Sequence, residues 1–165
     1  MAAAPDDRAQ AYILPPGEIR RKPHVVPHIK TDASDTGGLL SLFEDSLAPG
    51  ASGPPVHVHS HEDEAFYVIE GALRMQVGDE IHEVPAGSFV WVPRGTAHGF
   101  ANASDGVTRM LGLAVPGGIE HFFEAQAEYL SSLHGAPDPS ELARIAAEYG
   151  NRMAGPPVKA ASRDA

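Results

Sequence analysis

Two short segments carry most of the chemically useful side chains of this chain, and their pattern limits what it can fold into. Residues 53–71 hold His57 and His59 inside an extended apolar run, and residues 87–102 hold His98 after a turn that contains proline and glycine. Side chains two residues apart in a strand lie on the same face of a sheet. We therefore expect the imidazoles of His57 and His59 to point toward one common ligand.

A carboxylate follows these histidines on a face that is otherwise apolar. Glu64 begins the next apolar run and shares its parity with Phe66 and Val68. A carboxylate in such a place is costly unless it is paired or bound to a metal ion. Three imidazoles and one carboxylate suit a divalent transition metal and leave coordination positions open for water or substrate. We predict that one ion is bound by His57, His59, Glu64 and His98.

Both segments resemble the two sequence motifs of the cupin family, G-x5-H-x-H-x(3,4)-E-x6-G and G-x5-P-x-G-x2-H-x3-N. The first motif is matched by His57, His59, Glu64 and Gly71, and the second by Gly87, Pro93, Gly95, His98 and Asn102. The opening glycine is displaced, because Ala51 stands at its position. The resemblance implies a barrel with a mononuclear metal site of three histidines and often one glutamate. It does not imply one reaction, since a fold hosts many functions.

Short apolar runs separated by Gly/Pro turns fill the middle of the chain. Strands are predicted at residues 39–47, 66–70, 73–77, 81–84, 88–92, 98–101 and 108–115. In the first of these, Leu40, Leu42 and Phe43 are expected to face the core. Many short strands joined by such turns indicate an antiparallel barrel. The predicted fold class is all-β, an antiparallel cupin β-barrel (jelly roll) with a C-terminal helical extension.

The 165 residues fit one domain with four parts. We expect an N-terminal arm (1–36), the cupin barrel (37–118), C-terminal helices (119–150) and a tail (151–165) that is loop and then disordered. The second helix should begin at Asp138-Pro139-Ser140-Glu141, which offers an N-cap and a proline in the first turn. Both helices are expected to pack on the outside of the barrel.

Composition excludes several classes of partner and compartment. The net charge is −10, from 22 acidic and 12 basic residues without a basic run, so nucleic acid is not an expected partner. There is no cysteine, and a metal site must therefore be built from histidine and carboxylate. Neither a signal peptide nor a long apolar segment is present, so we predict no membrane span and a cytoplasmic location.

Three functions remain open at this stage. The stretches 118–123 and 149–150 resemble small single-domain cupins related to quercetinase, which implies a metal-dependent dioxygenase acting on an enol, flavonol or polyketide-like aromatic. One alternative is a non-redox metal-dependent polyketide cyclase or isomerase. Another is a non-enzymatic cupin that binds a small ligand. The ion would be iron, nickel, cobalt, manganese or zinc.

Within the dioxygenase hypothesis each candidate residue has a role. Glu64 would either ligate the ion or accept a proton from a substrate hydroxyl as general base. The walls of the pocket for the small-molecule substrate are predicted to be Phe66, Met75, Phe100 and Met110. His61 is expected to support the site from outside or to be solvated, and Asn102 to hold the loop after His98. The face on which Trp91 lies is left open.

A homodimer is the predicted oligomeric state. Tyr67 and Ile69 make the outer face of a central strand apolar, and such patches often mark interfaces. The proline-flanked residues 12–14 could add to the sheet edge of a neighbouring copy. The competing hypothesis is that the C-terminal helices cover the apolar face within a monomer, through Phe122, Phe123, Leu142 and Ile145.

Overall fold

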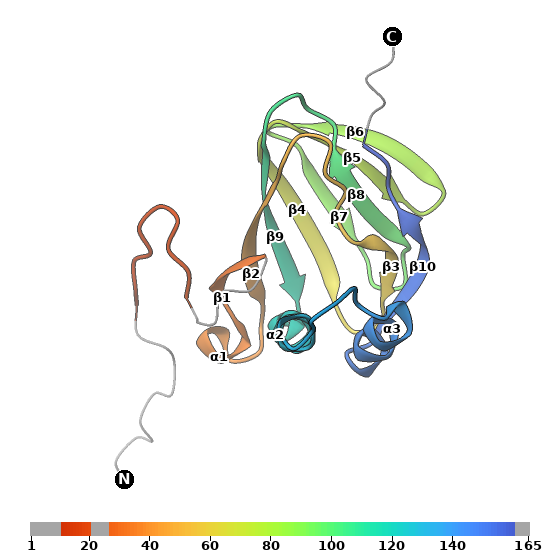
Figure 1. Ribbon diagram of the computed structural model, residues 1–165. Helices are drawn as coiled ribbons and strands as arrows, with labels where there is room; N and C mark the ends of the chain where they lie inside the picture. Colours follow the sequence, from red (N-terminus) through yellow and green to blue (C-terminus); the bar gives the residue numbers. More distant parts are fainter. Residues whose placement is uncertain (1–10, 21–26, 161–165) are drawn as a thin grey trace.

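The computed structural model describes residues 11–20 and 27–160, and its strands form two facing sheets (Figure 1). The strands are β1 (His28–Thr31), β2 (Ser41–Leu47), β3 (Pro55–His59), β4 (Asp63–Glu70), β5 (Ala72–Val77), β6 (Glu80–Pro85), β7 (Phe89–Val92), β8 (His98–Asn102), β9 (Thr108–Val115) and β10 (Asn151–Pro157). The helices are α1 (Ala33–Thr36), α2 (Ile119–Ser131) and α3 (Pro139–Glu148).

Each sheet has five strands, and neighbouring strands are antiparallel. Sheet A has the order β1-β2-β9-β4-β7, and sheet B has the order β10-β3-β8-β5-β6. Alternate residues of the inner strands fill the space between the sheets, because side chains in a strand alternate between faces. The fully buried side chains include Phe66, Val68, Leu73, Met75 and Met110. The predicted all-β barrel is confirmed.

In β2, the side chains that point into the barrel differ from those that were predicted to do so. Phe43 is buried as expected, but its inward neighbour is Ser41; Leu42 lies on the opposite face and Leu40 precedes the strand. The Ser41 hydroxyl donates to the buried carboxylate of Glu120 at 2.5 Å. Ser41 therefore points into the barrel, next to Glu120. Because side chains alternate along a strand, Leu42 points outward.

The barrel was predicted to begin at residue 37, but its sheets include residues earlier in the chain. Residues 28–31 form β1, which pairs with β2 at the edge of sheet A, and α1 follows after its N-cap Asp32. Residues 11–14 form no strand in the described chain. Instead, the hydroxyl of Tyr12 donates to the carbonyl of Lys30 at 2.8 Å, so this segment lies against β1.

The segment predicted to be a loop after residue 150 is also different. Residues 151–157 form β10, which pairs with β3 at the edge of sheet B. A strand that ends in two prolines is tolerated only at an edge, where its missing N–H groups leave no ladder unfilled. Val158 then packs on Val56 and Ala101 behind β3. Residues 161–165 lie outside the described residues.

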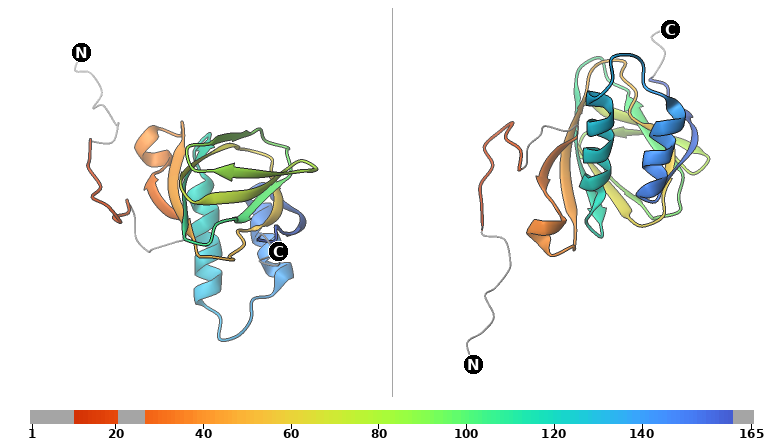
Figure 2. Two further views of the ribbon diagram at one scale, coloured as in Figure 1. Left: turned by 90° about the horizontal axis from the view of Figure 1, so that it is seen from above. Right: turned by 60° about the horizontal axis from the view of Figure 1, so that its bottom comes forward.

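The two C-terminal helices lie side by side beneath one end of the barrel (Figure 2). As predicted, Asp138 caps α3 and accepts a hydrogen bond from the backbone N–H of Ser140 at 2.9 Å. Both helices were expected to pack on the outside of the barrel, but α2 also contributes to the core. Ile119 belongs to the buried core, and Phe123 meets Phe43 edge to face at 5.5 Å. The apolar side of α2 therefore closes the barrel end.

Candidate metal centre

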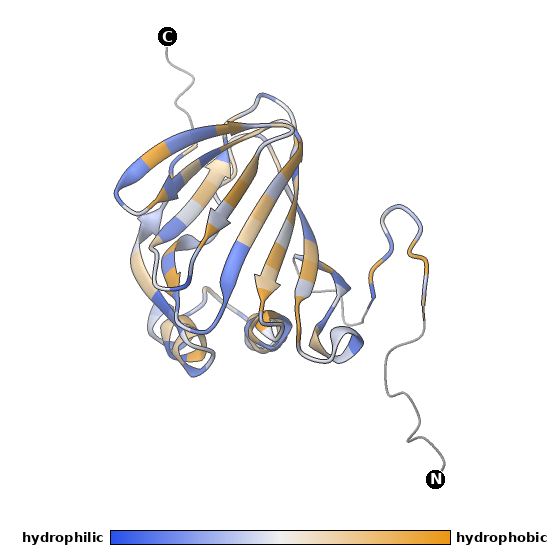
Figure 3. Ribbon diagram, turned by 180° about the vertical axis from the view of Figure 1, so that it is seen from behind, coloured by the Kyte–Doolittle hydropathy of each residue, from blue (hydrophilic) through white to orange (hydrophobic). Residues whose placement is uncertain are grey.

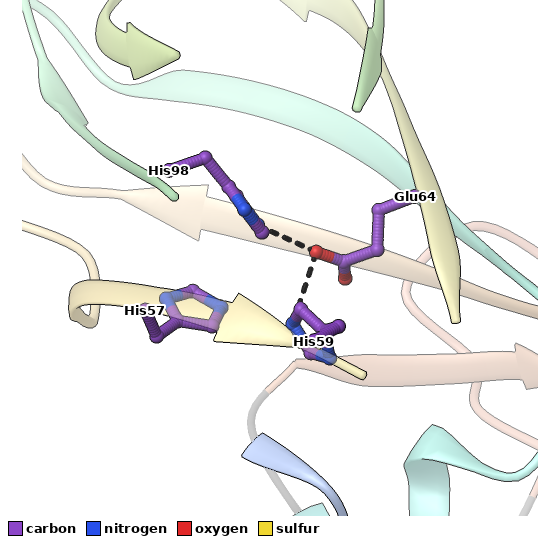
Figure 4. Close-up of side chains that lie close together, drawn as sticks. All are labelled: His57, His59, Glu64 and His98. Atoms are coloured by element: carbon purple, nitrogen blue, oxygen red, sulfur yellow. Dashed lines mark hydrogen bonds and ion pairs between the residues drawn. The ribbon is translucent and has the colours of Figure 1, made fainter. Parts of the chain in front are cut away.

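Three strands bring the four predicted ligands together (Figure 4). His57 and His59 come from β3, Glu64 from β4 and His98 from β8. The register of β3 and β8 sets His57 directly opposite His98. One ligand atom from each of the four residues lies within 4.8 Å of all the others. The sheets thus converge on a single point inside the barrel.

Each imidazole is oriented through the ring nitrogen that faces away from this point. The Nδ1–H of His57 donates to the Pro55 carbonyl at 2.9 Å, and that of His98 donates to the Thr96 carbonyl at 3.1 Å. The Nδ1 of His59 lies 3.3 Å from a carboxylate oxygen of Glu62. Such partners set the tautomer and turn Nε2 toward the shared point.

Glu64 is the negative group of the cluster. It is only 4% exposed, and its Oε2 lies 2.7 Å from Nε2 of His98 and 3.2 Å from Nε2 of His59. Burial by itself raises the pKa of a carboxyl group, but hydrogen bonds to His59 and His98 outweigh burial and hold the pKa of Glu64 well below its usual range. Glu64 is therefore ionised in this environment.

The two histidines of β3 differ in their electrostatics. Burial, helped by the neighbouring His98 and His59, lowers the pKa of His57 to about 4. Burial also lowers the pKa of His59, yet bonding to Glu62 and Glu64 outweighs it and raises the pKa to about 9. A neutral His57 is ready to ligate, whereas His59 is paired with two carboxylates. The two carboxylates therefore stabilise a positive charge on the ring of His59.

The residues present fit a metal ion. His59 Nε2 is fully enclosed, and its one near partner within the described residues is Glu64 Oε2 at 3.2 Å, which is not a well-formed hydrogen bond. Buried polar atoms normally have a partner, so this nitrogen points to a missing one. Three imidazole nitrogens and a carboxylate oxygen are suitable donors for a divalent transition metal. We regard His57, His59, Glu64 and His98 as a candidate metal site.

An apolar cavity of about 380 Å³ adjoins the cluster and is lined in part by His57, His59 and Glu64. Phe66 and Phe100, predicted as pocket walls, line it. Met75 and Met110 do not; both are fully buried in the barrel core. Strand parity places both methionines inside, but the depth of a side chain in a barrel depends on how the sheets close.

Several wall residues were missed from the sequence. They come from β2, α2 and β10 and include Phe43, Asp45, Phe122, Phe123, Asn151 and Met153. Asp45 shares the parity of Phe43, a signal that was available in the sequence. Burial raises the pKa of Asp45. No comparable pattern marks Asn151, which lies in a segment without apolar alternation.

The secondary candidates have separate outcomes. His61 is exposed, and it is the neighbouring Glu62 that contacts His59. Asn102 holds the loop as predicted: its Nδ2 donates to three carbonyls, and its Oδ1 accepts from the Ser104 N–H at 2.7 Å. Trp91 lies on the outer face of sheet A and is 47% exposed.

The fold and site define a class of protein, a double-stranded antiparallel barrel with a candidate centre of three histidines and one glutamate. Residues 43–116 match the family model described as a cupin domain. Residues 43–116 are therefore a cupin domain, as the sequence motifs indicated.

Two relatives are similar in sequence. The chain is 36% identical over 119 residues to quercetin 2,3-dioxygenase of Bacillus subtilis, which is 71% of this chain and 35% of that enzyme. The chain therefore spans about a third of the length of that relative. It is also 26% identical over 110 residues to an uncharacterised protein of Methanocaldococcus jannaschii, covering 67% of this chain and 82% of that protein.

Solved structures share the fold. A Klebsiella pneumoniae protein with a double-stranded β-helix domain has a TM-score of 0.54 at 18% identity, over 66% of this chain and 92% of that one. A predicted oxalate decarboxylase from Thermotoga maritima has a TM-score of 0.52 at 18% identity, over 54% and 77%. At these identities the likeness shows the fold alone. Within the described residues, the helices are too short or too polar to cross a membrane.

Proposed function

We propose that this protein is a metal-dependent dioxygenase that acts on an enol, flavonol or polyketide-like aromatic. One observation carries the proposal: three of the four clustered candidate ligands, His57, His59 and Glu64, line an apolar cavity of about 380 Å³. A cavity of this size can enclose a small aromatic ligand. The similarity to a quercetin 2,3-dioxygenase supports the same substrate class.

Each ligand residue has a distinct task in this proposal. His57, His59 and His98 hold the ion through Nε2, because their Nδ1 atoms are bonded elsewhere. When bound, a divalent transition metal supplies Lewis acidity and, if redox-active, a route for electrons between substrate and dioxygen. The candidate ions are iron, nickel, cobalt, manganese and zinc.

Glu64 is proposed as a fourth ligand and as the general base. Its carboxylate lines the cavity and is buried between two imidazoles, so it is within reach of a hydroxyl group of a ligand in that cavity. An ionised carboxylate can accept the proton of such a hydroxyl group. The apolar walls, which include Phe66 and Phe100, exclude water from the resulting anion.

Metal analysis combined with oxygen uptake tests the proposal. Protein purified without a histidine tag should contain about one equivalent of a transition metal and consume dioxygen when quercetin is added. Zinc without oxygen uptake would instead favour a cyclase or isomerase. Protein that binds no metal but binds a small ligand reversibly would favour a non-enzymatic binding function.

The proposed assembly is a homodimer through the outer face of sheet A. Neighbouring strands there place four large apolar side chains in solvent, with Tyr67 opposite Phe89. Their exposed fractions are 46% for Tyr67, 39% for Ile69, 64% for Phe89 and 47% for Trp91. Hydrophobic residues recur along the strands of the barrel (Figure 3). The helices α2 and α3 lie at the barrel end and leave this face uncovered.

A second copy of the chain is the proposed partner because the patch has charges of both signs at its rim. Asp63 pairs with Arg94 at 2.9 Å, and Glu44 pairs with Arg109 at 2.7 Å. A twofold axis sets the same surface against itself, so a rim that mixes acidic and basic groups can be complementary to its own copy. A rim of one sign would repel its copy.

A further inference from the structure

The edge strand β10 completes the cavity wall beside the candidate metal ligands. Its register with β3 sets Asn151 opposite His59 and Met153 opposite His57. Residues directly opposite each other in an antiparallel pair project from the same face. Asn151 and Met153 both line the cavity, as do the two histidines. The side chain of Asn151 is therefore on the cavity side, next to a candidate metal ligand.

The side-chain oxygen of Asn151 has no partner in the described chain. Asn151 is 3% exposed, and its buried Oδ1 accepts no hydrogen bond there. Buried side-chain acceptors are nearly always satisfied, because an unmade bond leaves the cost of desolvation without compensation. An unpaired buried oxygen in a cavity wall points to a donor on the molecule that fills the cavity.

A second buried asparagine shows what a structural role looks like in the same protein. Asn102 is 1% exposed, and both ends of its amide are fully used. Its partners are the carbonyl oxygens of Leu47, Ala48 and Gly106, the N–H of Ser104 and the hydroxyl of Thr108. Asn102 and Asn151 are similarly buried but differ in their side-chain hydrogen bonds. The hydrogen bonds of Asn102 stabilise a loop, whereas Asn151 Oδ1 accepts no hydrogen bond within the described residues.

The start of β10 is held in one place. The Gly150 carbonyl accepts from the backbone N–H of Ser60 at 2.9 Å and from its hydroxyl at 2.7 Å. Gly150 has φ +77°, and a Cβ there would come within 2.6 Å of the Ser60 hydroxyl oxygen. Only glycine fits both conditions. Asn151 therefore follows an anchored residue, which fixes the place of its Cα in the cavity wall.

We propose that Asn151 is a substrate-recognition residue whose Oδ1 accepts a hydrogen bond from the enol hydroxyl group of the bound substrate, before Glu64 removes that proton. The inference rests on the proposed function and assigns one specificity contact within it. An amide oxygen selects a donor, so a ligand that presents only a carbonyl or ether oxygen at this point is rejected. A site that pairs with a hydroxyl discriminates strongly against the analogue without it, since its own polar atom is then left unpaired.

Two flavonoids provide the probes. Quercetin carries a 3-hydroxyl group, and luteolin is the same molecule without it. Binding of both to the full-length, metal-loaded protein is measured by calorimetry with oxygen excluded, so that neither is consumed. Asn151→Leu should weaken quercetin binding about tenfold, or about 1.4 kcal/mol, and leave luteolin binding nearly unchanged. Equal losses for both flavonoids, or no loss for quercetin, would overturn the inference.

Met153→Leu is the matched control. Met153 lines the same cavity two residues further along β10 but offers no hydrogen-bond acceptor of comparable strength. Its substitution should change the affinities for quercetin and luteolin by the same factor. A selective loss of quercetin binding in Met153→Leu would show that the discrimination comes from cavity shape, and would count against Asn151.

Thermal unfolding without ligand separates recognition from a structural role. Asn151→Leu removes an unpaired buried acceptor and should leave the unfolding midpoint unchanged or raise it. Asn102→Leu removes five hydrogen bonds and should lower it by several degrees. A fall in Asn151→Leu as large as that in Asn102→Leu would overturn the inference.

If the wild-type protein binds neither flavonoid, the proposed substrate class fails and the inference fails with it. Failure in the variants alone leaves the proposed function standing.

Discussion

The two faces of strand β4 are both apolar, yet they contact different surroundings. On the inner face Glu64, Phe66 and Val68 are 4%, 2% and 0% exposed, because sheet B covers them. On the outer face Tyr67 and Ile69 are 46% and 39% exposed. The apolar residues of the inner face are buried within one chain. The apolar residues of the outer face remain in solvent in one chain, and we propose that a second copy of the chain covers them.

This contrast separates stability from assembly. Inner-face residues are buried within the monomer and should control the free energy of unfolding and the chemistry of the cavity. Outer-face residues contact little within the monomer, so they should control the mass of the particle. Substitutions of neighbouring residues on one strand can therefore have effects of different kinds.

The largest effect is expected for Glu64→Gln on the inner face. A neutral amide can offer an oxygen to the ion but cannot accept a proton as a base, so turnover should fall by a factor on the order of 10² to 10⁴ while much of the metal is kept. Oxygen uptake and metal content are measured on the same sample. Unchanged turnover would remove Glu64 from the mechanism.

His57→Ala is the comparison for that variant. It should lose the metal itself, because the nearest further histidine, His61, is exposed and has no place in the cluster. Retention of one equivalent of metal in His57→Ala would contradict the ligand assignment. The double change His57→Ala with His61→Ala would then show whether His61 substitutes.

Phe66→Ala and Tyr67→Ala compare adjacent residues on opposite faces. Phe66 is 2% exposed and packs on Phe100 with ring centroids 5.6 Å apart, so its truncation should cost about 3–5 kcal/mol of the free energy of unfolding. Tyr67→Ala should cost less than about 1 kcal/mol within the monomer. Both are measured by denaturant unfolding of dilute protein. Similar losses would contradict the division between the faces, and Phe66→Leu serves if Phe66→Ala does not fold.

A charge placed in the outer patch should dissociate the dimer. Trp91→Glu puts a carboxylate at the proposed interface, where burial without a partner is costly, and light scattering should report a monomeric mass at micromolar concentration. Leu130→Glu is the control, because Leu130 is 43% exposed but lies on α2, away from the patch. A wild-type protein that is monomeric at this concentration would defeat the proposal.

A chain that begins at Gly17 tests the N-terminal arm: an unchanged dimer would exclude a role for residues 12–14 in dimer formation.

The smallest effect is expected at the rim of the outer face. Hydrogen bonds from Arg94 lower the pKa of Asp63 from 3.8 to about 2. Because the folded-state pKa is the lower one, the stabilisation is complete above pH of about 4 and is lost as the pH falls toward about 2. Arg94→Ala should reduce the unfolding midpoint slightly at neutral pH and match the wild type near pH 2. A constant difference across this range would show that Asp63 is not the titrating group.

The candidate ligand set follows largely from local sequence. His57 and His59 share a face because they are two apart in a strand, and Glu64 has the parity of Phe66. Strand alternation depends only on backbone geometry, so it can be inferred without knowing which strands are neighbours. The hairpin turn between β5 and β6 is also local, because Val77 pairs with Glu80 across two residues, of which the first is the glycine that such turns favour.

Other features depend on contacts between distant segments. The cavity wall at Asn151 exists because β10 pairs with β3, about ninety residues earlier in the chain, and no short-range pattern encodes that pairing. The inward parity of β2 places Ser41 next to Glu120, a residue far away in the sequence, and the depth of Met75 and Met110 follows from closure of the two sheets. The sequence by itself determined the strands, the candidate ligands and the family, since these rest on local periodicity and spacing. Only the tertiary structure decided which side chains line the cavity and which apolar face stays in solvent, because both depend on long-range packing.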